Sequence, residues 1–246
     1  MILSAQYISA ESADGIKKSA PVNFKEIWGY MMRGEENLFT GLEPVTDIFY
    51  FSCDITYKGR LKLNIAPPVL PMGSGVKRKI HIVIADISNT SLMHFVLNSG
   101  YGVRDSFISD IVEVSRKFDG VQIDFESVAA DDGAAFLEFL AVLKNRLEPG
   151  KTLSVALPAR RSSVDDAYNY KKISGIGDRV FIMTYDQHWS TSVPGSVASI
   201  SWCKDVISYA INEVPPEKLV MGIPFYGRSW QDKSLNRSMR TRNLPD

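Results

Sequence analysis

The residues best suited to chemistry lie in one segment, Asp119–Glu126, with the sequence DGVQIDFE. Apolar residues alternate with small or polar ones, and this alternation predicts a strand with one apolar and one polar face. Strands of α/β proteins are buried on both faces, where carboxylates are costly unless they are paired or used. Same-face neighbours stand roughly 6.5–7 Å apart along a strand. Asp124 and Glu126 could therefore act together on one group of substrate atoms.

Two carboxyl groups on one strand face could divide the work on a substrate, one as an acid and the other as a charge. Glu126 ends the predicted strand and is the candidate acid, because burial near apolar groups raises the pKa of a carboxyl group. Two other interpretations are a structural polar network and a metal site formed by Asp119, Asp124 and Glu126. Against the metal site, no strand-end His joins these carboxyls, and oxygen-only sites usually take ligands from loops.

The segment resembles the Asp-Gly-x-Asp-x-Asp-x-Glu signature of family 18 glycoside hydrolases, the chitinase-like enzymes. Three later segments resemble the family's fifth, sixth and seventh strands in the correct order: Leu153–Pro158, Met183–Asp186 and Gly222–Arg228. The resemblance runs from about residue 24 to residue 230. It is strongest with the branch that contains bacterial spore-cortex and peptidoglycan N-acetylglucosaminidases, in which Asn often stands at the place of Gln122.

The resemblance implies a retaining mechanism in which the 2-acetamido oxygen of the substrate is the nucleophile. Glu126 would protonate the leaving oxygen, Asp124 would orient the acetamido N–H, and Tyr185 would hydrogen-bond the acetamido oxygen. The implied partner is an N-acetylated amino-sugar oligosaccharide or polysaccharide, of chitin or peptidoglycan type, with no cofactor and no metal. The residues expected to bind this substrate are Asp119, Gln122, Asp186, Tyr226, Arg228 and Trp189.

Some of these residues have an equally good structural interpretation. Trp189 could stack on a sugar or simply pack, and Arg228 could pair with a carboxylate at the strand ends for either purpose. Gln122 departs from the family, which usually has an Asp there. Gln122 could donate its amide N–H to Asp124 but adds no charge, so we expect Asp124 to ionise more readily than beside an Asp.

The composition excludes several function classes. The 246 residues include 28 basic and 28 acidic residues, a formal net charge of zero, whereas nucleic-acid binding favours a basic excess. No apolar run reaches membrane-spanning length. Met1–Ala10 lacks the features of a signal peptide, although the resemblance favours an extracellular or cell-envelope location. Nothing in the sequence predicts the oligomeric state.

Strand and helix patterns alternate along the chain and predict an α/β fold, a (β/α)8 TIM-type barrel. We expect residues 1–23 to be a flexible lead-in and residues 24–246 to be one catalytic barrel. Helical spacing of apolar residues covers 107–115, 136–147 and 200–211. The predicted strands are Ile27–Tyr30, Val45–Cys53, Lys79–Ala85, Val121–Glu126, Leu153–Leu157, Val180–Tyr185 and Leu219–Ile223.

Two regions interrupt this alternation. Asp54–Lys77 is rich in Pro and Gly without a helical period, and predicts an extended excursion with a small hairpin around Gly59. Gln231–Asp246 is polar, and no eighth strand is predicted there, so the barrel should be truncated after the seventh strand. We expect a gap at that edge, or its coverage by the tail or by another chain.

The main rival is a catalytically silent barrel that only binds glycans, and a third interpretation is a barrel fragment without a ligand. The presence of Glu126 favours an enzyme. The missing eighth strand favours the rivals.

Overall fold

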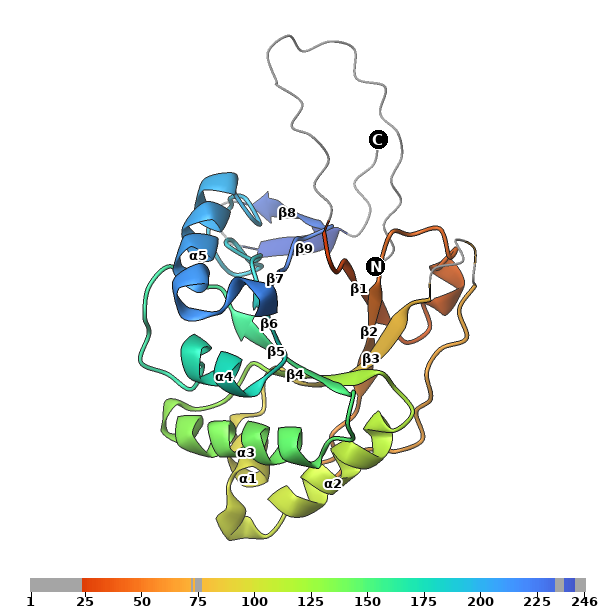
Figure 1. The fold of residues 1–246 in the computed structure, drawn as a ribbon. Coiled ribbons are helices and arrows are strands. Elements are labelled where there is room, and N and C mark those ends of the chain that lie inside the picture. The colour runs from red at the N-terminus through yellow and green to blue at the C-terminus, as the bar shows by residue number, and fades with distance from the viewer. Residues whose placement is uncertain (1–23, 72, 74–76, 233–236, 242–246) are drawn as a thin grey trace.

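A computed structural model describes residues 24–71, 73, 77–232 and 237–241, so the expected lead-in lies outside the described residues. Seven parallel strands form one curved sheet in chain order, a half-barrel (Figure 1). This confirms the predicted α/β barrel fold, truncated after its seventh strand. The strands are β1 (Trp28–Met32), β2 (Asp47–Cys53), β3 (Lys79–Asp86), β4 (Gly120–Phe125), β5 (Thr152–Pro158), β6 (Arg179–Met183) and β7 (Leu219–Met221).

The central strands form because their residues are β-branched or aromatic and are buried on both faces. All six residues of β4 are buried, and Ile82, Val83 and Ile84 of β3 are fully buried. At the start of β4, a Cβ on Gly120 would lie 2.5 Å from His81 Nδ1 and from the Thr152 carbonyl oxygen. A glycine is therefore needed there for the three neighbouring strands to approach one another.

Five helices lie outside the strands from β3 to β7 (Figure 1). Apolar side chains of α2, including Phe107, Ile108 and Ile111, are fully buried. Helices α1, α4 and α5 are preceded by the N-cap residues Asn89, Asn169 and Ser199. The side chain of each accepts a hydrogen bond from the first turn of its helix, as is usual for these residue types. The short α4 was not predicted from the sequence. The bounds are α1 (Thr90–Leu97), α2 (Arg104–Ser115), α3 (Gly133–Arg146), α4 (Tyr170–Ile176) and α5 (Ile200–Glu213).

The connection from β2 to β3 has no helix in its described residues. Ile55 and Leu61 pair antiparallel, and Gly59 has a φ of 67° in the turn between them. The predicted hairpin around Gly59 is therefore confirmed. Arg60 fixes it to α2, because its Nε and Nη2 donate to the two Asp110 oxygens at 2.6 and 2.7 Å.

The two edges of the sheet, β1 and β7, do not pair with each other in the described chain. The tail forms an antiparallel hairpin of β8 (Gly227–Asp232) and β9 (Arg237–Thr241), drawn on the open side of the sheet in Figure 1. The hairpin is a separate two-stranded sheet and adds no strand to the barrel, so the expected truncation after the seventh strand holds, although the hairpin itself was not predicted. These residues lack an apolar alternation, and the hairpin depends on backbone pairing, which leaves no such signal.

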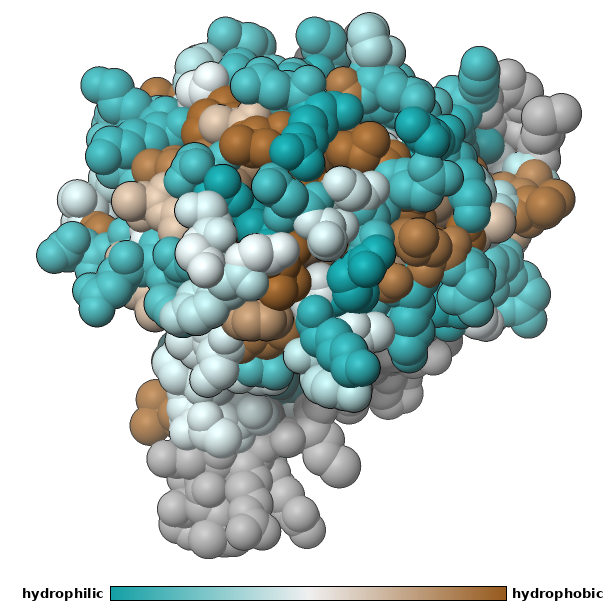
Figure 2. Space-filling model, turned by 90° about the horizontal axis from the view of Figure 1, so that it is seen from below, coloured by the Kyte–Doolittle hydropathy of each residue, from teal (hydrophilic) through white to brown (hydrophobic). Residues whose placement is uncertain are grey.

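No helix within the described ranges has the length and apolar character needed to span a bilayer. The face shown in Figure 2 is largely hydrophilic, and its hydrophobic residues lie in separate groups.

Candidate active site

Strand β4 delivers two carboxyl groups to its carboxyl end. Asp124 is buried, with 6% of its surface exposed, whereas Glu126 directly follows the strand and is exposed. The Glu126 N–H donates to the Asp86 carbonyl oxygen at 2.8 Å, which extends the ladder between β3 and β4 by one residue. Asp86 also accepts from the Ser127 hydroxyl at 2.8 Å. Glu126 therefore stands on a fixed backbone while its side chain can meet a ligand.

The surroundings of this pair favour retention of a proton. Burial, and then the charge of Glu126, raise the pKa of Asp124 to about 7. Burial, and then the charge of Asp186, raise the pKa of Glu126 above its usual value. The absence of a charge at Gln122 therefore does not give Asp124 an ordinary acidity, because burial is the larger cause. Because the charge of Glu126 acts on Asp124, the two carboxyl groups titrate as a coupled pair.

Gln122 is fully buried beside this pair, on the same face of β4. Its Oε1 accepts a hydrogen bond from the Tyr30 hydroxyl at 2.8 Å. Neither Gln122 Nε2 nor Asp124 Oδ1 has a hydrogen-bond partner among the described residues. The expected donation from Gln122 to Asp124 is therefore not made, because Tyr30 orients the amide. Sequence reasoning missed Tyr30, although its place at the end of the first predicted strand was a signal.

The loop after β6 contributes Tyr185 and Asp186. Burial and then the nearby Asp124 carboxylate raise the pKa of the Tyr185 phenol, so Tyr185 stays neutral and can donate a proton in a hydrogen bond. Asp186 has a φ of 58°, a left-handed conformation that Asp tolerates better than most residues. A Cβ on Gly222 would lie 2.9 Å from Tyr185 Cε1. Glycine at 222 therefore allows the chain after β7 to pass close to the Tyr185 ring.

Two residues beyond β7 hold Asp186 in place. The Tyr226 hydroxyl donates to Asp186 Oδ1 at 2.5 Å, and Arg228 Nη2 donates to the same oxygen at 2.8 Å. The Tyr226 ring lies edge-on to Tyr185, with centroids 6.2 Å apart. Tyr226 was expected at the end of the seventh strand, but β7 ends at Met221, and Tyr226 lies in the following loop. Arg228 belongs to β8.

Comparison with known proteins agrees with this arrangement. Residues 79–244 match the model of glycosyl hydrolases family 18. The chain belongs to this family.

The relatives of this family 18 chain are longer than the chain itself. The cortical fragment-lytic enzyme of Bacillus anthracis is 32% identical over 207 residues, which are 76% of this chain and 46% of that protein. The spore cortex-lytic enzyme SleL of Bacillus cereus matches with a TM-score of 0.73 and 26% identity, over 87% of this chain and 55% of that chain. A chitinase of Chromobacterium violaceum has the same fold, with a TM-score of 0.72 and 23% identity, over 87% of this chain and 72% of that one. The matched region spans less than half the length of such curated relatives.

Two residues expected in the family 18 site are not joined to it by a contact. Asp119 lies at the opposite, amino end of β4, where its Oδ2 accepts from the Ile80 N–H at 2.8 Å. It is too far from Glu126 to share a substrate or a metal with it. Trp189 is half exposed in the loop between β6 and α5, and its indole N–H donates to Thr191 Oγ1 at 2.9 Å. Among the described residues, no group of three or more His, Cys, Asp or Glu residues is arranged to hold a metal ion.

Proposed function

We propose that this chain hydrolyses β-linked glycans that contain N-acetylglucosamine, with retention of configuration and with the substrate's acetamido group as the nucleophile. Residues 24–246 would act as one catalytic unit. The observation that carries the proposal is the carboxyl pair at the end of β4, with Asp124 buried, Glu126 exposed and both pKa values raised. Membership of glycosyl hydrolases family 18 supports the reaction class.

In the first step, the acetamido oxygen attacks the anomeric carbon while the bond to the leaving oxygen breaks. Glu126 gives its proton to that oxygen, a role suited to an exposed carboxyl group with a raised pKa. Ionised Asp124 stabilises the acetamido N–H as positive charge develops. Tyr185, as a neutral phenol, donates to the acetamido oxygen. In the second step, water attacks the same carbon, the bond from that carbon to the acetamido oxygen breaks, and Glu126 takes the proton that the water loses.

The carboxylates close to Glu126 support a nucleophile from the substrate rather than from the protein. Asp186 Oδ1 already accepts hydrogen bonds from Tyr226 and Arg228. Asp124 is almost completely buried. The burial of Asp124 and the two hydrogen bonds on Asp186 Oδ1 disfavour either group as a nucleophile, and Asp186 is better suited to contact a sugar hydroxyl.

The test is turnover of fluorogenic N-acetylglucosamine oligomers by the wild type and by Glu126→Gln. Removal of a general acid should lower kcat by roughly 10²- to 10⁴-fold, while Asp86→Asn, which changes a neighbouring carboxyl at the end of β3, should lower it far less. Thiazoline analogues of N-acetylglucosamine should inhibit, because they mimic the cyclised intermediate. Equal rates on glucosides and on N-acetylglucosaminides would contradict participation of the acetamido group.

The rival function is glycan binding without hydrolysis. It would be supported if the wild type and Glu126→Gln bound N-acetylglucosamine oligomers equally well and neither released product. For the polymer, the names of the relatives, a cortical fragment-lytic enzyme and a spore cortex-lytic enzyme, favour a peptidoglycan substrate over chitin. Product release from each polymer, measured side by side, decides between the two.

A further inference from the structure

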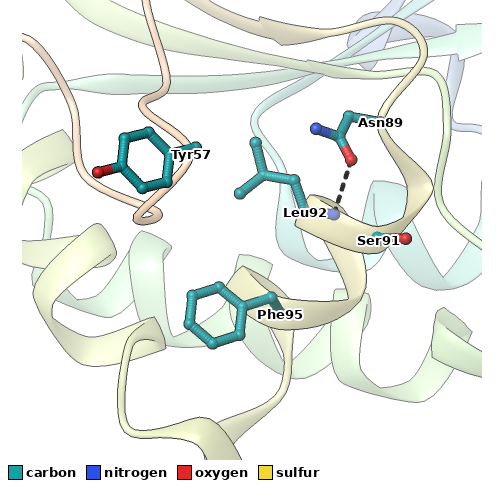
Figure 3. Close-up of a pocket in the computed structure, with 5 residues that line it drawn as sticks. All are labelled: Tyr57, Asn89, Ser91, Leu92 and Phe95. Carbon is teal, nitrogen blue, oxygen red and sulfur yellow. Dashed lines mark hydrogen bonds between the residues drawn. The ribbon is translucent and has the colours of Figure 1, made fainter.

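Aromatic side chains that the proposed reaction does not use lie in and beside α1, one in the helix, one in the β2–β3 hairpin and one just after the helix. Tyr57 is 83% exposed and Tyr101 is 52% exposed, and Phe95 lies 5.5 Å from Tyr101 between ring centroids. Tyr57 and Phe95 border a hollow of about 340 Å³, together with Asn89, Ser91 and Leu92 (Figure 3). We call Tyr57, Phe95, Tyr101 and this hollow the α1 aromatic surface.

Tyr57 is exposed, yet it stands on a backbone that is held in place. It belongs to the hairpin between β2 and β3, which packs tightly on the helices. A Cβ on Gly59 would lie 2.7 Å from side-chain atoms of Val96 and Val103. The paired hydrogen bonds from Arg60 to Asp110 anchor the same hairpin to α2. The backbone that carries Tyr57 is thus held in place, and Lys58 Nζ lies over the Tyr57 ring, 5.6 Å from its centroid.

Tyr101 is oriented by a chain of polar groups. The His94 Nε2 and the Tyr101 hydroxyl are 2.8 Å apart, and His94 Nδ1 lies 2.8 Å from Asp132 Oδ1. Asn98 Nδ2 donates to the same Asp132 oxygen at 2.9 Å, and the Asp132 side chain is only 5% exposed. A buried carboxylate therefore fixes the ring of an exposed tyrosine. This order lowers the entropy that the ring would lose on binding a ligand.

The lining of the hollow suits an uncharged ligand with both apolar and polar faces. Asn89 uses its Oδ1 to accept from the Leu92 N–H at 3.0 Å, and Figure 3 shows its amide nitrogen turned toward Tyr57. The five lining residues carry no formal charge. Aromatic ring faces stack on the C–H face of a sugar, and an amide can bond its hydroxyl or acetamido groups. The hollow is shallow and open to solvent, a shape that suits an extended chain of sugars lying along the surface.

We propose that the α1 aromatic surface is a second glycan-binding site, which holds a strand of the polymeric substrate beside the catalytic end of the sheet, where the Asn89 N–H donates to Asp86 Oδ1 at 2.8 Å. The inference rests on the proposed function, because that function supplies a polymer of neutral sugars as the ligand. Tyr57 and Tyr101 stack on pyranose rings, and Asn89 hydrogen-bonds a substituent. Binding at two places on one strand raises the local concentration of the substrate at Glu126.

The test separates polymer binding from catalysis. Sedimentation with insoluble peptidoglycan and with chitin is measured for Glu126→Gln, so that the polymer stays intact. Adding Tyr57→Ala or Tyr101→Ala should weaken binding to the preferred polymer by roughly threefold to tenfold for each ring, as expected for one lost aromatic contact. Adding Phe24→Ala, another exposed aromatic residue at 69% exposure, should leave binding unchanged. Tyr101→Phe keeps the ring and should lose less than Tyr101→Ala.

In the Glu126-containing protein, Tyr57→Ala and Tyr101→Ala should leave kcat/KM on a soluble N-acetylglucosamine dimer unchanged, because neither residue belongs to the proposed catalytic group. Unchanged polymer binding by the Tyr57→Ala, Tyr101→Ala double variant overturns the inference. It is equally overturned if sedimentation velocity shows a wild-type dimer that Tyr57→Ala converts to monomer. If the wild type fails to cleave the dimer, the proposed function fails, whereas the binding comparison still reports on the α1 aromatic surface.

Discussion

Replacing Gln122 with Asp should move the acidic limb of the pH–rate profile to higher pH. Gln122 is fully buried on the same face of β4 as Asp124. A carboxylate at 122 would add a negative charge beside a pair that already holds a proton, since burial raises the pKa of Asp124 to about 7. Like charges favour retention of the proton, and the acidic limb of kcat/KM reports the proton that must leave before reaction.

The size of the shift follows from the strand geometry. Residues two apart on one face of a strand lie roughly 7 Å apart, and two unit charges at that distance repel by roughly 2 kcal/mol at an effective dielectric constant of about 20. This energy corresponds to about 1.5 pKa units. Because the three carboxyl groups are coupled, the shift belongs to the group and not to Asp124 alone.

Gln122→Asn is the matched control, because it shortens the side chain as Gln122→Asp does but remains neutral. Both variants lose the geometry of the hydrogen bond from Tyr30 at 2.8 Å, so a difference between them reports the charge. The measurement is kcat/KM on a fluorogenic N-acetylglucosamine oligomer between about pH 4 and pH 9, a window that spans the usual carboxyl range and the raised values. Superimposable acidic limbs in the two active variants would refute the electrostatic coupling.

Three further predictions concern the anchoring of Asp186, the packing of Tyr185 and the ion pair between Glu26 and Arg179. Tyr226→Phe removes only the hydroxyl that donates to Asp186, and should lower kcat/KM by about tenfold, the size of one hydrogen bond to a charged group; an unchanged kcat/KM would contradict a role in anchoring Asp186. Gly222→Ala places a methyl group against the Tyr185 ring. It should raise the activation free energy derived from kcat by more than it lowers the free energy of unfolding derived from the melting temperature. Equal changes in the two free energies would indicate a general packing defect. Glu26→Gln should cost about 1 kcal/mol at pH 7, because the hydrogen bond from Arg179 lowers the pKa of the partly exposed Glu26. Since a lowered pKa stabilises the fold above the unfolded value, this cost should begin to shrink as the pH falls through about 4 and should vanish below the lowered pKa of folded Glu26 in urea unfolding. A cost that does not change with pH in this acidic range would exclude the ion pair as its cause.

The strands were predictable because they are buried on both faces and rich in Val, Ile and Phe. The hydrophobic pattern located all seven strands of the parallel sheet, with boundaries that differ by a few residues. Helix α4 was missed because seven residues, Tyr170–Ile176, are too few for a clear helical period. The β8–β9 hairpin was missed because its strands carry no apolar alternation.

The contents of the site were harder to predict than the fold. A motif can identify Asp124, Glu126, Tyr185 and Asp186, because their spacing along β4 and after β6 is local. It cannot show that the hydroxyl of Tyr30, which is 92 residues away in the sequence, donates a hydrogen bond to Gln122 Oε1. The expected hydrogen bond from Gln122 to Asp124 failed for this reason: the partner of an amide is decided by the fold around it.

The open edge of the sheet should affect the proposed site unequally. Strands β4 and β6 lie inside the sheet with a paired neighbour on each side, so Glu126 and Tyr185 are supported without an eighth strand. Tyr30 stands on the edge strand β1, and Tyr226 follows the other edge strand, β7. Unpaired edges are where local opening costs least. An eighth strand would therefore change the orientation of Gln122 and the anchoring of Asp186 before it changed the acid itself.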